Sequence, residues 1–188
     1  MAIHGSDKSS EAVDDCDMIV NGGHAVMLSV KISRELEEIT KSWVSASNAV
    51  EDTGHHVTVA FIGRDLKRSV GEDVTSCVEQ ILEKIPRTIR LSGKFSMFGP
   101  ENNRMVARVV QSRSLMFYRE KLLHYLGAHY IRIMSGYNPH ITLATANPGD
   151  SVKPPKSMPE ADLVVSGVIV KLGSRIRTQY PLDIDGRL

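Results

Sequence analysis

The chain has 188 residues, 41% of them hydrophobic and 24% charged, which is typical of one globular domain or two small lobes with a sizeable core. Its formal net charge of +1 argues against extensive contact with a nucleic-acid backbone, so we expect no duplex DNA partner. It also lacks a CxxC pair, a signal-peptide pattern and an apolar run of membrane-spanning length, so we expect a cytoplasmic protein without a disulfide scaffold or membrane association.

The first half of the chain is expected to contain an arm, two strands and two helices. In chain order these are a flexible polar arm (1–20), a strand (24–32), a helix (34–47), a strand (55–63) and a helix (70–85). Ser33 is a suitable N-cap for the first helix, because glutamates fill its first turn. Ser69 and Glu72 have the spacing of a capping box for the second helix, which ends before Pro86. Everything after the arm, residues 21–188, is expected to form a single domain.

The second half of the chain repeats the same kinds of element. In chain order we expect a strand with a glycine break (88–99), a strand (104–110), a helix (115–126), a strand (140–146), a Pro-rich loop (147–159), a long strand (161–173) and a short last strand near Tyr180. Ser112 or Ser114 is expected to cap the helix, whose leucines lie on roughly one face.

Each half therefore has the order strand, capped helix, turn and a strand that carries a histidine. This weak repeat favours an α+β fold over a parallel α/β sheet. We expect two antiparallel-rich lobes that face one another about a pseudo-twofold axis, because the equivalent histidines of the two halves would then come together.

The two histidine strands carry the same short motif. The first reads His56-Val-Thr58 and the second His140-Ile-Thr142. Because side chains alternate across a strand, each motif presents an imidazole and a hydroxyl on one face and apolar anchors on the other. A pseudo-twofold axis would bring two imidazoles and two hydroxyls to a single site.

This inventory of groups suits a phosphodiester. Hydroxyls donate hydrogen bonds to the non-bridging oxygens, and imidazoles exchange protons near neutral pH. One neutral histidine would take a proton from water, while the other, protonated, gives one to the departing ribose oxygen. Either histidine alone could equally be structural, but two matched triplets favour the paired site. Since the motifs bring no carboxylate or thiolate, we expect neither a metal nor another cofactor.

The segments "HHVTVAFIG" and "NPHITLAT" resemble the two signature motifs of the 2H phosphoesterase superfamily. The "PHITL" form of the second motif is especially similar to the bacterial and archaeal members once called 2′-5′ RNA ligases. The resemblance covers residues 24–180 and implies a bilobed α+β fold around a central cleft, with metal-independent cleavage of a 2′- or 3′-ribose phosphodiester. It implies the roles of the motif residues as well: an acid–base pair, His56 and His140, and two phosphate-binding hydroxyls, Thr58 and Thr142.

Three further residues are candidates for substrate binding. Tyr137, just before the second motif, could stack on a base or touch phosphate, or it could pack the turn. Arg104 and Arg108 alternate on one strand and could hold an anion, or they could be solvated surface groups. Lys153 and Lys156 follow the second motif in the Pro-rich loop, for which a plain surface role is the simpler interpretation.

The resemblance implies a small cyclic nucleotide or a short oligonucleotide as the substrate. One hypothesis is a viral or phage enzyme that degrades cyclic oligonucleotide or 2′-5′ oligoadenylate signals, and so serves immune evasion. The alternatives are a 2′,3′-cyclic phosphodiesterase of RNA ends in RNA processing, or a non-catalytic module of the same superfamily that binds a nucleotide. A metal-dependent hydrolase is a less favoured third alternative, and we predict no particular oligomeric state.

Overall fold

The computed structural model of the chain describes residues 18–98, 103–127, 136–147 and 158–182. Most of the expected arm, residues 1–17, lies outside the described residues. The last part of the expected arm is not separate, because Ile19 and Val20 already belong to the first strand. The Pro-rich loop, including Lys153 and Lys156, also lies largely outside the described residues.

The element order agrees with the predicted α+β class. In chain order the elements are β1 (Ile19–Lys31), α1 (Arg34–Ser47), β2 (Val50–Glu51), β3 (His56–Lys67), α2 (Arg68–Glu79), a 3₁₀ turn (Leu82–Lys84), β4 (Thr88–Phe98), β5 (Arg104–Val109), α3 (Arg113–Leu126), β6 (His140–Thr145), β7 (Asp162–Leu172) and β8 (Arg175–Pro181). The two-residue β2 and the 3₁₀ turn are additions to the predicted elements.

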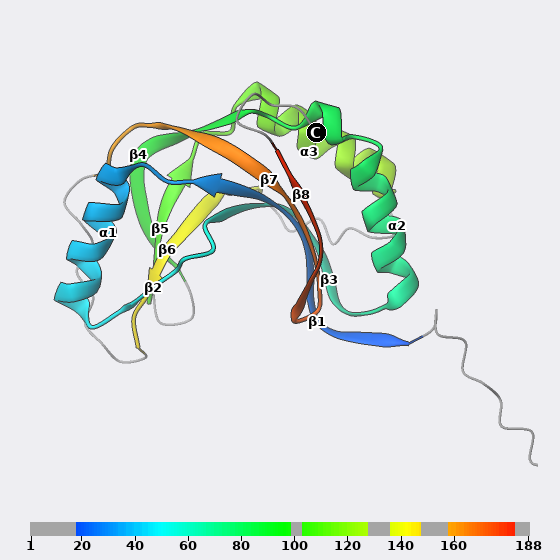
Figure 1. Cartoon of the computed structure of the whole chain (residues 1–188), viewed down its shortest axis with the longest axis horizontal. Helices are drawn as coiled ribbons and strands as arrows, with labels where there is room; N and C mark the ends of the chain where they lie inside the picture. Colours follow the sequence, from blue (N-terminus) through cyan, green and yellow to red (C-terminus); the bar gives the residue numbers. More distant parts are fainter. Residues whose placement is uncertain (1–17, 99–102, 128–135, 148–157, 183–188) are drawn as a thin grey trace, which may run out of the picture.

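The strands form one antiparallel hydrogen-bonded sheet in the order β1-β3-β6-β5-β4-β7-β8, with β2 paired to β6. Strand β7 also pairs with β1, so the strand order closes on itself. The two expected antiparallel halves are joined where β3 pairs with β6 and where β4 pairs with β7. In Figure 1 the sheet arches, with α1 outside one end and α2 and α3 outside the other.

The hydrophobic core lies between one face of this sheet and the three helices. From the helices, Trp43 of α1, Val78 of α2 and Leu122 of α3 are each at most 5% exposed. From the strands, Val57 and Ile141 are fully buried in the same cluster. Burial of each large apolar side chain contributes about 1.5–3 kcal/mol, so the central residues of both motifs are held firmly in place.

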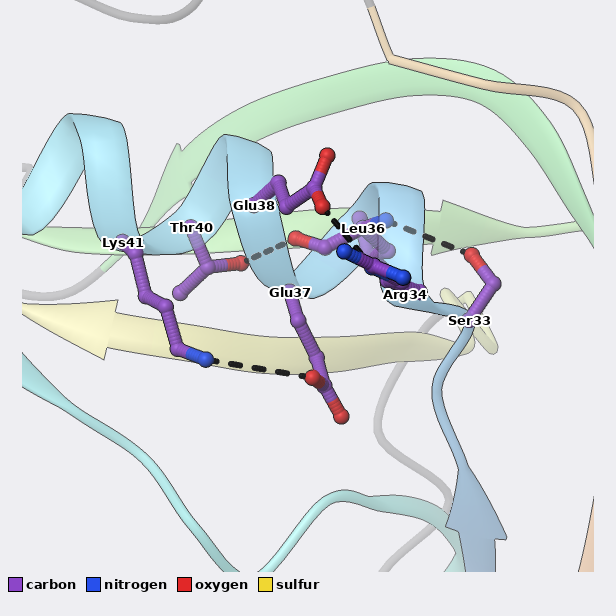
Figure 2. Close-up of polar contacts among 7 residues, drawn as sticks. All are labelled: Ser33, Arg34, Leu36, Glu37, Glu38, Thr40 and Lys41. Carbon is purple, nitrogen blue, oxygen red and sulfur yellow. Dashed lines mark hydrogen bonds and ion pairs between the residues drawn. The ribbon is translucent and has the colours of Figure 1, made fainter.

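Helix α1 begins where the sequence predicts. Ser33 has an extended backbone, and its Oγ accepts a hydrogen bond from the backbone N–H of Leu36 at 3.3 Å. One turn later, the buried Thr40 donates its hydroxyl hydrogen to the carbonyl of Leu36 at 2.8 Å. Two exposed ion pairs follow along the helix, Arg34–Glu38 and Lys41–Glu37 (Figure 2). Local sequence was sufficient here because every contact that defines the helix start is local.

The start of α2 differs from the predicted capping box. Ser69 does not cap the helix, since α2 begins at Arg68 and no side chain caps its first turn. The backbone N–H of Arg68 instead donates to the carbonyl of Met18 at 2.9 Å. The reason is tertiary: β3 stays paired with β1 as far as Lys67, so the strand passes directly into the helix. The helix also ends at Glu79, earlier than predicted, and a 3₁₀ turn follows.

Strand β1 begins at Ile19, earlier than the predicted 24, and β3 continues to Lys67, past the predicted 63, whereas most other boundaries agree closely. Ser112, rather than Ser114, caps α3, and its Oγ accepts from the backbone N–H of Leu115 at 3.3 Å. The expected glycine break in β4 is Gly93, whose positive φ of 69° lies at a register shift between β4 and β5. Each helix in the described ranges is too short or too polar to cross a lipid bilayer.

Candidate functional site

The two histidine–threonine motifs lie side by side in the middle of the sheet. Strands β3 and β6 are antiparallel neighbours, and the central residues of the two motifs, Val57 and Ile141, are directly opposite each other. Antiparallel pairing therefore puts each histidine beside the threonine of the other motif. This is the local twofold arrangement that the repeat predicted, and it brings two segments 84 positions apart in the sequence to one site.

The four polar side chains of the motifs share one face of the sheet. Opposite residues of an antiparallel pair point to the same face, and neighbours along a strand alternate. Since Val57 and Ile141 point into the core, His56, Thr58, His140 and Thr142 point to the opposite face, where each is partly exposed. We call this surface of the sheet the site face.

Both imidazole rings are oriented in the same way. Nδ1 of His56 lies 2.6 Å from the carbonyl oxygen of Gly54, and Nδ1 of His140 lies 2.9 Å from that of Asn138. Because a carbonyl oxygen only accepts, each Nδ1 is the nitrogen that carries the hydrogen. Nε2 of each ring is then left to accept a proton from, or donate one to, a bound molecule.

A stack of side chains supports His140 from the neighbouring strands β5 and β4. Arg108 is directly opposite His140 in the register. Its Nε donates to Oγ of Ser96 at 3.0 Å, and its guanidinium lies 4.9 Å from the centre of the Phe98 ring. The Phe98 ring in turn meets the His140 ring edge-on, with 4.8 Å between the ring centroids. This stack fixes the imidazole and keeps a positive charge one strand away from it.

The surroundings of His140 lower its pKa below the ordinary value. Burial is the largest cause, and the positive charges of Arg108, His56 and Arg104 act in the same direction. The hydrogen bond to the carbonyl of Asn138 acts in the opposite direction and offsets part of the effect. The lowered pKa favours the neutral form of His140, in which Nε2 is able to accept a proton.

Tyr137 connects the two motifs from the turn before β6. Its hydroxyl donates to the carbonyl of Thr58 at 3.2 Å, and the guanidinium of Arg119 lies 4.5 Å from its ring centre. The side chain of Gln111 donates to the backbone carbonyl of Tyr137. Burial raises the pKa of Tyr137 to about 12, so its hydroxyl stays protonated. The structure thus gives Tyr137 contacts that hold the turn, while contact with a substrate stays a prediction.

The structure brings most of the sequence-predicted residues to the site face. Arg104 is exposed and lies one strand away from the end of β6, opposite Thr145. Ser96 and Phe98 could not be recognised from the sequence, because their position at the site depends on the pairing of β4 with β5. The only local signal for them was the alternation of residues along β4.

A metal site does not emerge from the described part of the chain. In those ranges, no three His, Cys, Asp or Glu side chains are grouped so that they could hold a metal ion. The groups that meet at the motifs are imidazoles and hydroxyls, and the positive charges of Arg108 and Arg104 beside His140 disfavour a bound cation.

Neither a family model nor a curated protein matches the sequence. Solved structures do match it over most of its length. Protein TT0787 of Thermus thermophilus is 18% identical with a TM-score of 0.60, and the match covers 85% of this chain and 97% of that protein. The MHV ns2 PDE domain is 13% identical with a TM-score of 0.56, covering 80% of this chain and 98% of that domain.

LigT of E. coli matches in several crystal structures. Its apo form is 15% identical with a TM-score of 0.51, and the match covers 86% of this chain and 96% of LigT. Its complex with 3′-AMP is 14% identical with a TM-score of 0.52, with the same coverage of 86% and 96%. These proteins are 2H phosphoesterases, so the chain has the 2H phosphoesterase fold, as the two motifs predicted.

Proposed function

We propose that this chain, with its 2H phosphoesterase fold, is a metal-independent phosphodiesterase that acts on 2′- or 3′-ribose phosphodiesters of cyclic nucleotides or short oligonucleotides. The observation that carries the proposal is the pairing of Val57 with Ile141, which sets two imidazoles and two threonine hydroxyls on one face. The complex of E. coli LigT with 3′-AMP, in the same fold, supports a small nucleotide as the ligand.

In the proposed reaction, the oxygen of a water molecule forms a bond to phosphorus as the bond to the ribose oxygen breaks. One histidine takes a proton from the attacking water, and the other gives its proton to the departing ribose oxygen. The hydroxyls of Thr58 and Thr142 donate hydrogen bonds to the non-bridging oxygens of the phosphate. General acid–base catalysis of this kind contributes roughly 10²–10⁴-fold for each well-placed group.

The surroundings of the two histidines favour His140 as the base and His56 as the acid. Arg108 lies opposite His140 and disfavours its protonated form. The register neighbour of His56 on β1 is Ser29, which carries no charge. The two imidazoles exchange protonation states in each turnover, and a bell-shaped dependence of rate on pH follows. Its two limbs belong to the coupled pair of histidines.

The remaining candidate residues have supporting roles in this proposal. Arg104 and Arg108 add positive charge on the β5 side of the bound phosphate, and Tyr137 positions the strands that carry the motifs. A cytoplasmic location stays a prediction. So does the narrower hypothesis of a viral or phage enzyme that destroys cyclic oligonucleotide or 2′-5′ oligoadenylate signals.

A panel of nucleotides tests the proposed function. The protein would be incubated with 2′,3′-cyclic nucleotides, cyclic di- and trinucleotides, 2′-5′ oligoadenylates and a short RNA with a cyclic phosphate end. We expect hydrolysis of at least one member, unchanged by EDTA, and the phosphate position in the product identifies the cleaved bond. Tight binding without turnover would favour a nucleotide-binding module instead. Reversible loss of turnover in EDTA would rule out the two-histidine mechanism.

A further inference from the structure

The site face differs in charge on its two sides. On the β1 side, the register neighbours of the first motif are Ser29 and Met27, and the next residues across, on β7, are a glycine and an isoleucine. On the β5 side, Arg108 and Val106 lie beside the second motif, and Arg104 lies beside Thr145 at the end of β6. Both arginines therefore lie on the β5 side, whereas the residues directly beside the first motif are uncharged.

Arg104 and Arg108 belong to the site face and not to the core. The pairing of β5 with β4 is regular from Arg104 to Ala107, and its pairing with β6 is regular from Val106 to Arg108. Alternate residues of β5 therefore point to the same face. Met105 and Ala107 point to the other face, into the core. Val106 is fully buried between the two arginines, Arg108 is partly buried and Arg104 is exposed. The pair thus forms a positively charged surface over an apolar floor.

The positive charge of this pair is not compensated within the described ranges. In residues 18–98, 103–127, 136–147 and 158–182, no carboxylate forms an ion pair with Arg104 or Arg108. The hydrogen bond of Arg108 goes to a neutral hydroxyl, that of Ser96. The two cations lie on the same face with Val106 between them, and a bound anion would compensate their charge.

The scissile phosphodiester alone does not account for both arginines. It carries one negative charge, and two imidazoles and two hydroxyls already converge on it. Arg108 is held by Ser96 and Phe98 next to the second motif, whereas Arg104 lies further along β5, opposite Thr145. Arg104 is therefore placed for an anion that lies beyond the reacting phosphate.

We propose that Arg104 and Arg108 form a second anion subsite that binds a further phosphate of the substrate. This inference rests on the proposed phosphodiesterase function. Planar guanidinium groups suit this role, because they donate two parallel hydrogen bonds to phosphate oxygens. The preferred substrates are then nucleotides or short oligonucleotides with at least two phosphate groups. Such a substrate extends from the motifs across β6 and β5, and its uncharged end lies toward β1.

The test compares two substrates that differ by one phosphate. Once the cleaved linkage is known, kcat/KM is measured for that substrate with and without a terminal 5′-phosphate, for example 2′,3′-cyclic AMP and its 5′-phosphorylated form. We expect the unmodified protein to prefer the substrate with two phosphates by roughly 10- to 100-fold, the range for charge-assisted hydrogen bonds. The R104Q variant is expected to lose most of this preference, because its kcat/KM falls much more for the two-phosphate substrate than for the one-phosphate substrate.

Lys171 provides a matched control, because it lies on the site face at the β7 side, opposite Ala25. The K171Q variant loses the same charge from the same face, and we expect it to keep the preference. R104K, which keeps the charge but not the planar donor geometry, is expected to keep part of it. Arg104 is a better test position than Arg108, whose side chain also supports Phe98.

Two results would overturn the second subsite while leaving the proposed function intact. One is equal kcat/KM for the two substrates with the unmodified protein, a measurement that needs no variant. The other is an equal fall for both substrates in R104Q, which would assign Arg104 to the reacting phosphate itself. Hydrolysis of no substrate in the panel would instead remove the proposed function.

Discussion

The two motifs have the same local geometry, but they lie in different surroundings. In each, a histidine two residues after a carbonyl acceptor points Nδ1 back to that carbonyl, and a buried aliphatic residue anchors the strand. The first motif has Ser29 and Met27 beside it on β1. The second has Arg108 beside it, stacked on Phe98. The repeat therefore brings two similar histidines together, and the flanking strands β1 and β5 give them different electrostatic environments.

This inequality matters because hydrolysis of a phosphodiester is not a symmetric reaction. The attacking water loses a proton and the departing oxygen gains one, so the two catalytic groups must differ in protonation state. A symmetric site would have both histidines in the same average state. The arginines on one side of the site face supply a difference in electrostatic environment, and they do so without disturbing the backbone symmetry of the motifs.

The largest expected effects come from the two histidines. His56→Ala and His140→Ala are each expected to lower kcat roughly 10²–10⁴-fold, because each removes one proton transfer. A substrate in which sulfur replaces the departing ribose oxygen then separates them, since a thiolate leaves without help from an acid. We expect this substrate to restore much of the activity of His56→Ala and little of that of His140→Ala.

The opposite pattern of rescue would exchange the roles of acid and base. Equal rescue of both variants would contradict fixed roles of His56 as the acid and His140 as the base. The melting temperature of each variant serves as a control for folding, because both side chains are partly exposed and their removal leaves the core intact.

The meeting of the motifs at one site could be predicted from the sequence, because both halves have the same order of elements and strand alternation puts each histidine and threonine on one face. The cap at Ser33 could be predicted for a similar reason, because its contacts are local. The start of α2 could not, because the pairing of β3 with β1 extends the strand past the expected cap at Ser69. Phe98 was missed because its contact with His140 crosses two strand pairings, β4 with β5 and β5 with β6, and each has its own register shift. Non-local register, rather than local propensity, thus limits what a single sequence predicts.

A smaller effect is expected from removing the charge that makes the halves unequal. In Arg108→Gln the pKa of His140 is expected to rise toward its ordinary value, because one of the positive charges that lower it is lost. The base is then protonated at a higher pH, so the acidic limb of the bell-shaped profile moves to higher pH. The rate at slightly acidic pH falls severalfold, while the rate at the optimum changes less.

Arg108→Lys is the matched control for this shift, since it keeps the charge while altering the contacts with Phe98 and Ser96. Its acidic limb is expected to stay close to that of the unmodified protein. A basic limb that moves in Arg108→Gln, with an unmoved acidic limb, would contradict the assignment of His140 as the base.

The smallest expected effect concerns the connection between the halves. Tyr137 precedes the second motif but donates its hydroxyl hydrogen to the carbonyl of Thr58 in the first. Tyr137→Phe leaves that carbonyl without this donor and is expected to lower the free energy of unfolding by about 0.5–1.5 kcal/mol. If the bond also positions the motifs, kcat falls more than KM changes. Tyr125→Phe, the same substitution at a tyrosine 47% exposed, is the control and is expected to change stability by less than about 0.5 kcal/mol. Equal stability and equal kcat for Tyr137→Phe and the unmodified protein would show that the strand pairings hold the two motifs in register without this hydrogen bond.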